Sequence, residues 1–178
     1  MDRQLGITSL FLAGMTALNP LFADSLCQQS EQVLFSCSTT HDKIISLCAS
    51  DSKDNGNTGI MYRFGNQNHV ELAYPASMQP AKQAFRGRAQ MFSGGGGIYL
   101  RFNNNDFDYV IYDGTGKGWQ MHGVVVLKNK KFVTYLACHN KPIAEISPQM
   151  LETLQVPSDS DDAEFFPGDI PSQLISNQ

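Results

Sequence analysis

Hydrophobic and polar residues alternate along much of the chain between Val33 and Cys138, and short runs of turn-forming residues interrupt the alternation. A period of two is typical of β-strands, because successive side chains point to opposite faces of a sheet. The pattern predicts strands over residues 33–37, 44–49, 60–64, 70–73, 89–92, 98–102, 107–112, 123–128 and 132–138. We therefore expect a mainly β domain, an antiparallel barrel or sandwich of about eight strands.

One short helix is predicted near the C-terminus, over residues 148–154. Ser147 is a favourable N-cap, and Pro148 suits the first helical position because its missing amide hydrogen has no partner there.

The N-terminal 23 residues have the order of a secretory signal peptide: one Arg, an uncharged apolar run over residues 5–17, the pair Asn19-Pro20 and the small residue Ala23. The apolar run is too short for a transmembrane helix, and Cys27 lacks a lipobox. A buried core helix is the alternative interpretation. We expect a mature chain that starts near Asp24, is periplasmic or secreted, and has no stable membrane insertion after cleavage.

Charge divides the remaining chain into a body and a tail. Residues 24–156 carry 12 basic and 11 acidic residues, whereas residues 157–178 carry five acids and no base. With three prolines in addition, this tail is predicted to be disordered, beside a single β domain over residues 24–156. Nothing in the body suggests the strongly basic face that a nucleic acid would require.

All four cysteines follow the predicted signal peptide, and an even number in an exported domain predicts two disulfides. Zinc is disfavoured because there is no C-x-x-C pair, and we expect no metal and no other cofactor. If Phe35 and Cys37 lie opposite Ala49 and Leu47, Cys48 points to the other face of the sheet, which disfavours a Cys37–Cys48 bridge. We favour Cys37–Cys138 with Cys27–Cys48, and a Cys48–Cys138 bridge stays open.

No catalytic motif emerges from the sequence. The glycines of residues 93–97 precede a strand rather than a helix, and Gly114-Thr115-Gly116-Lys117-Gly118 lacks the remaining P-loop residues. The four histidines, His41, His69, His122 and His139, have no local triad partners. A hydrolase site assembled from distant loops around His122 or His139 remains an alternative.

Two glycine-rich loops, residues 93–97 and 113–119, are the predicted partner-binding surface. Glycine lets a backbone approach a partner closely, and Tyr and Trp often anchor protein interfaces. The predicted contact residues are Ser93, Gly94, Gly96, Tyr99, Tyr112, Lys117 and Trp119. In the alternative interpretation the glycines only turn the chain, and Tyr99, Tyr112 and Trp119 pack within the domain.

Short motifs carry two resemblances. Phe35-Ser36-Cys37, Leu47-Cys48, Tyr62-Arg63-Phe64-Gly65 and Tyr99-Leu100-Arg101-Phe102 resemble segments of uncharacterised small exported proteins of Gram-negative bacteria. More distantly, Ser93-Gly94-x-Gly96-x-x-Tyr99, Thr115-x-Lys117-Gly118 and Cys138 are similar to the periplasmic inhibitors of C-type lysozyme. That resemblance implies a small antiparallel β-barrel that blocks the lysozyme cleft with both loops, with Ser93, Tyr99 and Lys117 in contact.

The chain departs from the inhibitor pattern in several places: Ile98 stands where a Lys or Arg often precedes the Tyr, four glycines are consecutive, and there are an acidic tail and additional cysteines. We predict a periplasmic binding or inhibitor protein rather than an enzyme, with a lysozyme-like or other cell-wall hydrolase as its protein partner. An immunity protein that neutralises a periplasm-delivered toxin is one alternative, and a secreted hydrolase is the other.

Overall fold

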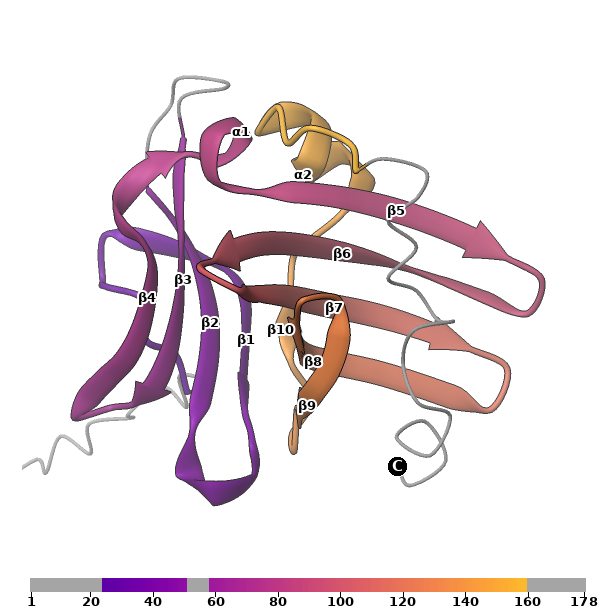
Figure 1. Cartoon of the computed structure of the whole chain (residues 1–178), viewed down its shortest axis with the longest axis horizontal. Coiled ribbons are helices and arrows are strands. Elements are labelled where there is room, and N and C mark those ends of the chain that lie inside the picture. The colour runs from indigo at the N-terminus through magenta and orange to yellow at the C-terminus, as the bar shows by residue number, and fades with distance from the viewer. Residues whose placement is uncertain (1–23, 51–57, 160–178) are drawn as a thin grey trace, which may run out of the picture.

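The structure, a computed structural model, describes residues 24–50 and 58–159, in which ten strands form two antiparallel five-stranded sheets (Figure 1). The first sheet has the order β10-β1-β2-β3-β4, with strands β1 Glu31–Ser38, β2 Ile44–Ser50, β3 Gly59–Asn66, β4 His69–Pro80 and β10 Ile143–Ala144. The second has the order β5-β6-β7-β8-β9, with strands β5 Arg86–Phe92, β6 Gly95–Asn104, β7 Phe107–Gly116, β8 Trp119–Lys128 and β9 Lys131–Ala137.

These two sheets confirm the predicted antiparallel, mainly β fold, and each of the nine predicted strands has a counterpart. The predicted helix is α2 (Pro148–Thr153), where the Ser147 hydroxyl accepts a 3.1 Å hydrogen bond from the Met150 amide. The sequence pattern missed the two-residue strand β10, the single-turn helix α1 (Ala81–Ala84) and the 3₁₀ turn η1 (Thr40–Asp42), since elements this short leave no readable period.

The predicted glycine-rich loops are shorter than expected, and this is a correction. Only Ser93-Gly94 and Lys117-Gly118 form turns, whereas the glycines on either side belong to β6 and β7. Gly95 pairs with Gly116, and Gly97 pairs with Gly114. Glycine weakens an isolated strand, but here two glycine-bearing strands lie beside each other, so the ladder continues to the hairpin ends.

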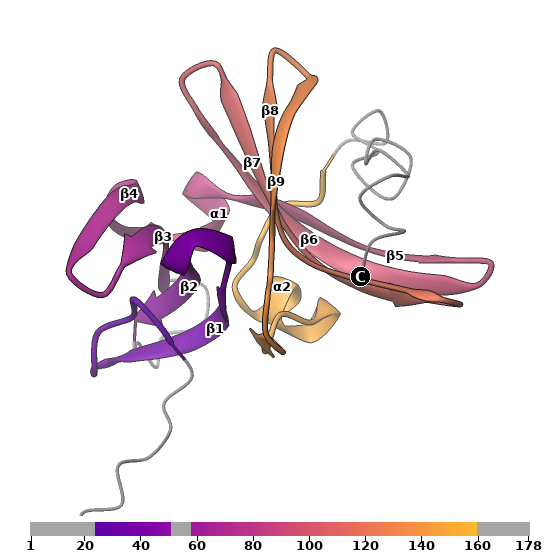
Figure 2. The same cartoon turned by 90° about the horizontal axis from the view of Figure 1, so that it is seen from below.

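The main core lies between the two sheets. Phe35, Ile45 and Leu47 of the first sheet and Leu100 and Ile111 of the second are fully buried in it. Phe102 stacks on Tyr109 with ring centroids 4.9 Å apart and on Tyr74 with centroids 4.3 Å apart, which extends the core with aromatic packing. Seen from below, the second sheet bends strongly, and its β5–β6 hairpin projects away from the first sheet (Figure 2).

The outer face of the second sheet carries a second apolar cluster, formed by Tyr99, Val110, Tyr112, Met121, Val125 and Leu127. Residues 157–159, which the tail prediction treated as disordered, lie beside this sheet. The amide of Gly87 donates to Pro157, the Asp159 carboxylate binds Arg101, and Asp159 is only 7% exposed. The ordered domain therefore extends to Asp159.

Both favoured disulfides are present: Cys27–Cys48 and Cys37–Cys138. The expected β1–β2 register is wrong by two residues, because Phe35 lies opposite Leu47 and Cys37 opposite Ile45. A shift of two residues keeps every side chain on its face. Cys37 consequently still points into the core, Cys48 still points outward, and the disulfide argument holds.

The predicted signal peptide and the tail after Asp159 lie outside the described residues. Within residues 24–50 and 58–159, no helix has the length and apolar character needed to cross a membrane.

Candidate functional site

The two glycine turns lie side by side at one end of the second sheet, on the right of Figure 1. The backbone amide of Lys117 donates a 2.7 Å hydrogen bond to the carbonyl oxygen of Gly94, which joins the β7–β8 turn to the β5–β6 turn. Gly94 has φ of 93° and Gly118 has φ of 82°, so both turns use a backbone conformation that other residues adopt at a cost. The tertiary structure thus unites two segments that are 23 residues apart in sequence.

Three of the predicted contact residues, Ser93, Gly94 and Lys117, are exposed at the turns. Met91 lies next to them and is 89% exposed, although the sequence analysis did not single it out. An exposed Met two residues before a glycine turn carries no sequence signal of its own, because strand alternation alone does not reveal which face is solvated. The turns and Met91 therefore form one surface, which we call the hairpin tip.

Two more predicted contact residues are partly buried beneath the tip. Gly96 belongs to β6, and a Cβ there would lie 2.5 Å from the sulfur of Met91. Trp119 covers Gly116, where a Cβ would lie 2.3 Å from the indole Nε1. The two large side chains therefore pack over glycine backbone, and glycine at 96 and 116 makes room for them.

Tyr99 and Tyr112 do not belong to the exposed tip, which is a correction to the predicted contact set. Each side chain is 1% exposed, and both belong to the outer apolar cluster of the second sheet. The Tyr99 hydroxyl donates a 3.1 Å hydrogen bond to Asp159, and burial together with the Asp159 charge raises the pKa of Tyr99. Their packing role agrees with the alternative interpretation of the sequence.

A polar groove lies on the core-facing side of the same sheet, beyond the packed core. Its cavity has a volume of about 1090 Å³, and it is lined on one side by Asp113, Thr115, Gln120 and His122 and on the other by the eight consecutive residues 138–145. A second cavity of about 370 Å³ shares Asp113, Thr115 and His122 and continues past Gly96 to Met91. The groove therefore extends toward the hairpin tip.

His122 and Asp113 form a cross-strand pair in this groove, with 2.6 Å between Nδ1 and Oδ1. About a quarter of each side chain is exposed. In the neutral tautomer that donates Nδ1–H to the carboxylate, Nε2 is an acceptor, so the ring is oriented to take a hydrogen bond or a proton from a bound molecule. The sequence analysis named His122 but not Asp113, because the pairing depends on the β7–β8 register.

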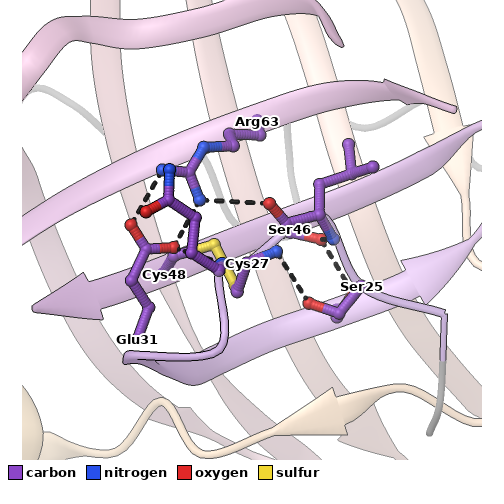
Figure 3. Close-up of polar contacts among 9 residues, drawn as sticks. Ser25, Cys27, Glu31, Ser46, Cys48 and Arg63 are labelled. Carbon is purple, nitrogen blue, oxygen red and sulfur yellow. Dashed lines mark hydrogen bonds and ion pairs between the residues drawn. A yellow bond between two sulfur atoms is a disulfide. The ribbon is translucent and has the colours of Figure 1, made fainter. Parts of the chain in front are cut away.

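A separate polar cluster, on the outer face of the first sheet, joins the N-terminal segment to the domain (Figure 3). Arg63 makes a two-point ion pair with Glu31 and also donates a 3.1 Å hydrogen bond to the carbonyl of Leu26. The side chains of Arg63 and Glu31 are less than a tenth exposed. Beside them, the Cys27–Cys48 disulfide closes the segment onto β2.

This cluster is also the one place in residues 24–50 and 58–159 where Cys, His, Asp or Glu side chains gather closely enough to suggest a metal, namely Cys27, Glu31 and Cys48. The two sulfurs are bonded to each other, and both Glu31 oxygens are bound by Arg63. Because both sulfurs are in the disulfide, neither is a thiolate ligand, and the Glu31 carboxylate is already paired with Arg63. The cluster is therefore a structural anchor rather than a metal centre.

Comparisons of the chain with family models, with curated proteins and with solved structures find no match.

Proposed function

We propose that this chain is an exported, periplasmic protein that uses its hairpin tip to bind and inhibit a protein partner, a lysozyme-like or other cell-wall hydrolase. The single observation that supports this proposal most is the hydrogen bond between Lys117 and Gly94, because it holds two exposed glycine turns together as one projecting surface. Two disulfides support export, since such bonds persist in oxidising compartments.

The chemistry of the tip suits the cleft of a glycosidase. Glycosidases that cleave by the usual route carry two carboxyl groups in the cleft, and these attract a cation. Lys117 offers an exposed ammonium group, Ser93 offers a hydroxyl, and Met91 offers an apolar side chain that adapts to the partner. The glycines leave the backbone of both turns accessible to close approach.

The test is inhibition of a panel of purified muramidases by the mature chain at micromolar concentration. We expect inhibition of at least one enzyme, with Ser93→Ala and Lys117→Ala each raising the inhibition constant about tenfold, the size of one well-placed polar contact. Lys130→Ala is the matched control, because Lys130 is also exposed but lies in the β8–β9 turn at the other end of β8.

Two outcomes would contradict the proposal. If Ser93→Ala and Lys117→Ala inhibit as strongly as the unaltered chain, the hairpin tip is not part of the interface. A chain that inhibits no muramidase would remove the hydrolase as partner, and protection against a toxin delivered to the periplasm would then point to an immunity protein.

A secreted hydrolase is the second candidate, and the His122–Asp113 pair favours it. Asp113 orients the ring as the acid of a catalytic triad does, and Thr115 is the one hydroxyl-bearing residue lining either cavity of the groove. Turnover of ester, amide or glycoside substrates that is lost in both His122→Gln and Asp113→Asn, and retained in His69→Gln on the other sheet, would establish this activity. Absence of turnover in the unaltered chain would exclude it for those substrates.

A further inference from the structure

The groove has an unusual construction, because one of its walls is continuous backbone. Residues 138–145 all line it, whereas the facing strands β7 and β8 contribute alternate residues. Eight consecutive residues lining one cavity indicate that a chain edge, rather than a sheet face, borders the space. In the sheet order, β10 is the last strand of its sheet, so this edge has no neighbouring strand among the described residues.

Backbone alternation shows which groups face the open side of β10. The amide of Glu145 donates to Leu34 of β1 at 2.8 Å, so Glu145 points its backbone toward β1. The preceding residue, Ala144, lies opposite Phe35 in a pair that does not exchange hydrogen bonds. The N–H and C=O groups of Ala144 therefore point away from β1.

A second strand edge faces the same space. The pairing of β8 with β9 covers only residues 123–128 of β8, so within the described chain the strand that neighbours Gln120 and Met121 is β7. The carbonyl of His122 accepts a 2.9 Å hydrogen bond from Cys138, on the side away from β7. By the same alternation, the backbone groups of Gln120 also point away from β7.

The two edges start together and then diverge. At Cys138 the chain still bonds to His122 of β8 and bridges to Thr39 at the end of β1. Beyond Cys138 the segment follows β1 into β10, while β8 continues to the hairpin tip, and the groove separates them. The result is a slot with an open strand edge on each side, which we call the strand slot.

We propose that the strand slot binds an extended segment of a protein partner, which pairs with β10 and with β8 at Gln120 and so completes a sheet between them. Addition of a strand to an exposed edge is a general mode of peptide recognition in which backbone hydrogen bonds supply affinity. This inference rests on the proposed function in one respect, namely that the partner is a protein.

The side chains of the slot define what the bound segment carries. Its wall on β7 and β8 is polar, with Asp113, Thr115, Gln120 and His122. Alternate residues of a strand paired with β8 share the sheet face of Gln120 and His122, so they should be hydrogen-bonding residues such as Ser, Thr, Asn or Gln. The lining segment of eight residues limits the paired length to about eight residues, or roughly 26 Å of extended chain.

The probe is a random octapeptide library displayed on phage and selected on the full mature chain. The best peptide is then synthesised, and its dissociation constant is measured by calorimetry. Ala144→Pro and Gln120→Pro each remove one amide that faces the slot, while the bonds of β10 to β1 and of β8 to β7 use other residues. Each is expected to weaken peptide binding at least about tenfold.

Ala144→Ser is the matched control. It keeps the backbone amide and is expected to bind the peptide within about threefold of the unaltered chain. Melting curves and intact masses establish that each Pro variant folds with both disulfides. As a measurement that needs no variant, the peptide is expected to slow hydrogen exchange at the amides of Gln120 and Ala144.

Several results would overturn the strand slot: selection of no peptide, equal affinity in the Pro and control variants, or binding without added exchange protection at the amides of Gln120 and Ala144. Dimerisation of the chain that Ala144→Pro abolishes would make a second copy the occupant and would also overturn it. None of these results bears on inhibition of a muramidase through the hairpin tip. Likewise, a lack of inhibition in the muramidase panel does not bear on peptide binding in the strand slot.

Discussion

The backbone amide of Lys117 donates a 2.7 Å hydrogen bond to the carbonyl oxygen of Gly94, and this contact connects two hairpins at their turns. Adjacent hairpins usually diverge at their ends because strands twist. Here the β6–β7 ladder continues to the pair Gly95–Gly116, so the turns stay together. The tip is consequently one surface with two chain segments, and changes in either segment should affect the other.

Gly116→Ala is expected to displace Trp119. A Cβ at residue 116 would lie 2.3 Å from the indole nitrogen, which is far closer than two such atoms approach. Because Trp119 is the only tryptophan, its fluorescence reports this movement directly, and we expect emission at longer wavelength as the ring becomes solvated.

Gly118→Ala is the control for that change. It imposes strain at φ of 82° but meets no atom within 4 Å, so it should lower stability by about 1 kcal/mol and leave the emission unchanged. An unshifted spectrum in Gly116→Ala would contradict the packing of Trp119 on Gly116.

Removal of the two disulfides should affect stability unequally. The Cys37–Cys138 bridge closes a loop with a sequence separation of 101, and the Cys27–Cys48 bridge closes one with a separation of 21. In the chain-entropy model these loops correspond to about 4.7 and about 3.3 kcal/mol. Urea unfolding of the two double Cys→Ala variants measures both values, and a larger loss for the Cys27–Cys48 variant would contradict this order.

Stability should fall in acid because of Glu31. Burial raises the pKa of Glu31, but the hydrogen bonds from Arg63 and from the Gln28 amide, together with the Arg63 charge, outweigh burial and lower it below its ordinary value of 4.5. A carboxyl group with a lowered folded-state pKa stabilises the fold above its unfolded pKa. That contribution is lost as the pH falls below about 4.5 and through the folded-state pKa.

Urea titrations between pH 3 and pH 6 measure this effect. Glu31→Gln should flatten the pH dependence and, at neutral pH, cost about 3 kcal/mol because it leaves the buried Arg63 without its counter-charge. Glu71→Gln, which alters the more exposed pair with Lys43, is the control and should change stability by less than about 1 kcal/mol. Equal effects of the two substitutions would contradict the expectation that the buried Arg63–Glu31 pair contributes more to stability than the more exposed Lys43–Glu71 pair.

Tyr62→Phe should stabilise the protein or leave it unchanged. The Tyr62 hydroxyl is buried and has no hydrogen-bond partner among the described residues, and burial raises its pKa. Removing an unsatisfied buried hydroxyl is expected to raise the free energy of unfolding by up to about 1 kcal/mol.

Tyr99→Phe is the comparison for Tyr62, because the Tyr99 hydroxyl binds Asp159. Its loss should lower the free energy of unfolding by about 1 kcal/mol or more, since the acceptor is charged. Thermal unfolding of the two variants side by side checks the prediction, and destabilisation by Tyr62→Phe would indicate that its hydroxyl has a partner.

Local signals in the sequence determined the strands, the helix start and the faces of the cysteines. The strands at 107–112 and 123–128 are visible as short apolar runs between turn residues, and both faces of these strands carry buried side chains. The Ser147 cap is equally local, since it depends on residues three apart. Even an incorrect register for β1 and β2 gave the right face for Cys37 and Cys48, because a shift of two residues keeps the parity of the strand.

The tertiary structure alone decided where the sites lie. The His122–Asp113 pair and the Arg63–Glu31 pair form because strand register and packing bring these residues together. The sequence around each residue does not reveal such a pairing. Tyr99 and Tyr112 resemble interface anchors in sequence, yet they are buried on the outer face of their sheet. The open edges at Gln120 and Ala144 exist because two strands separate after Cys138, and separation of strands is a property of the assembled sheets.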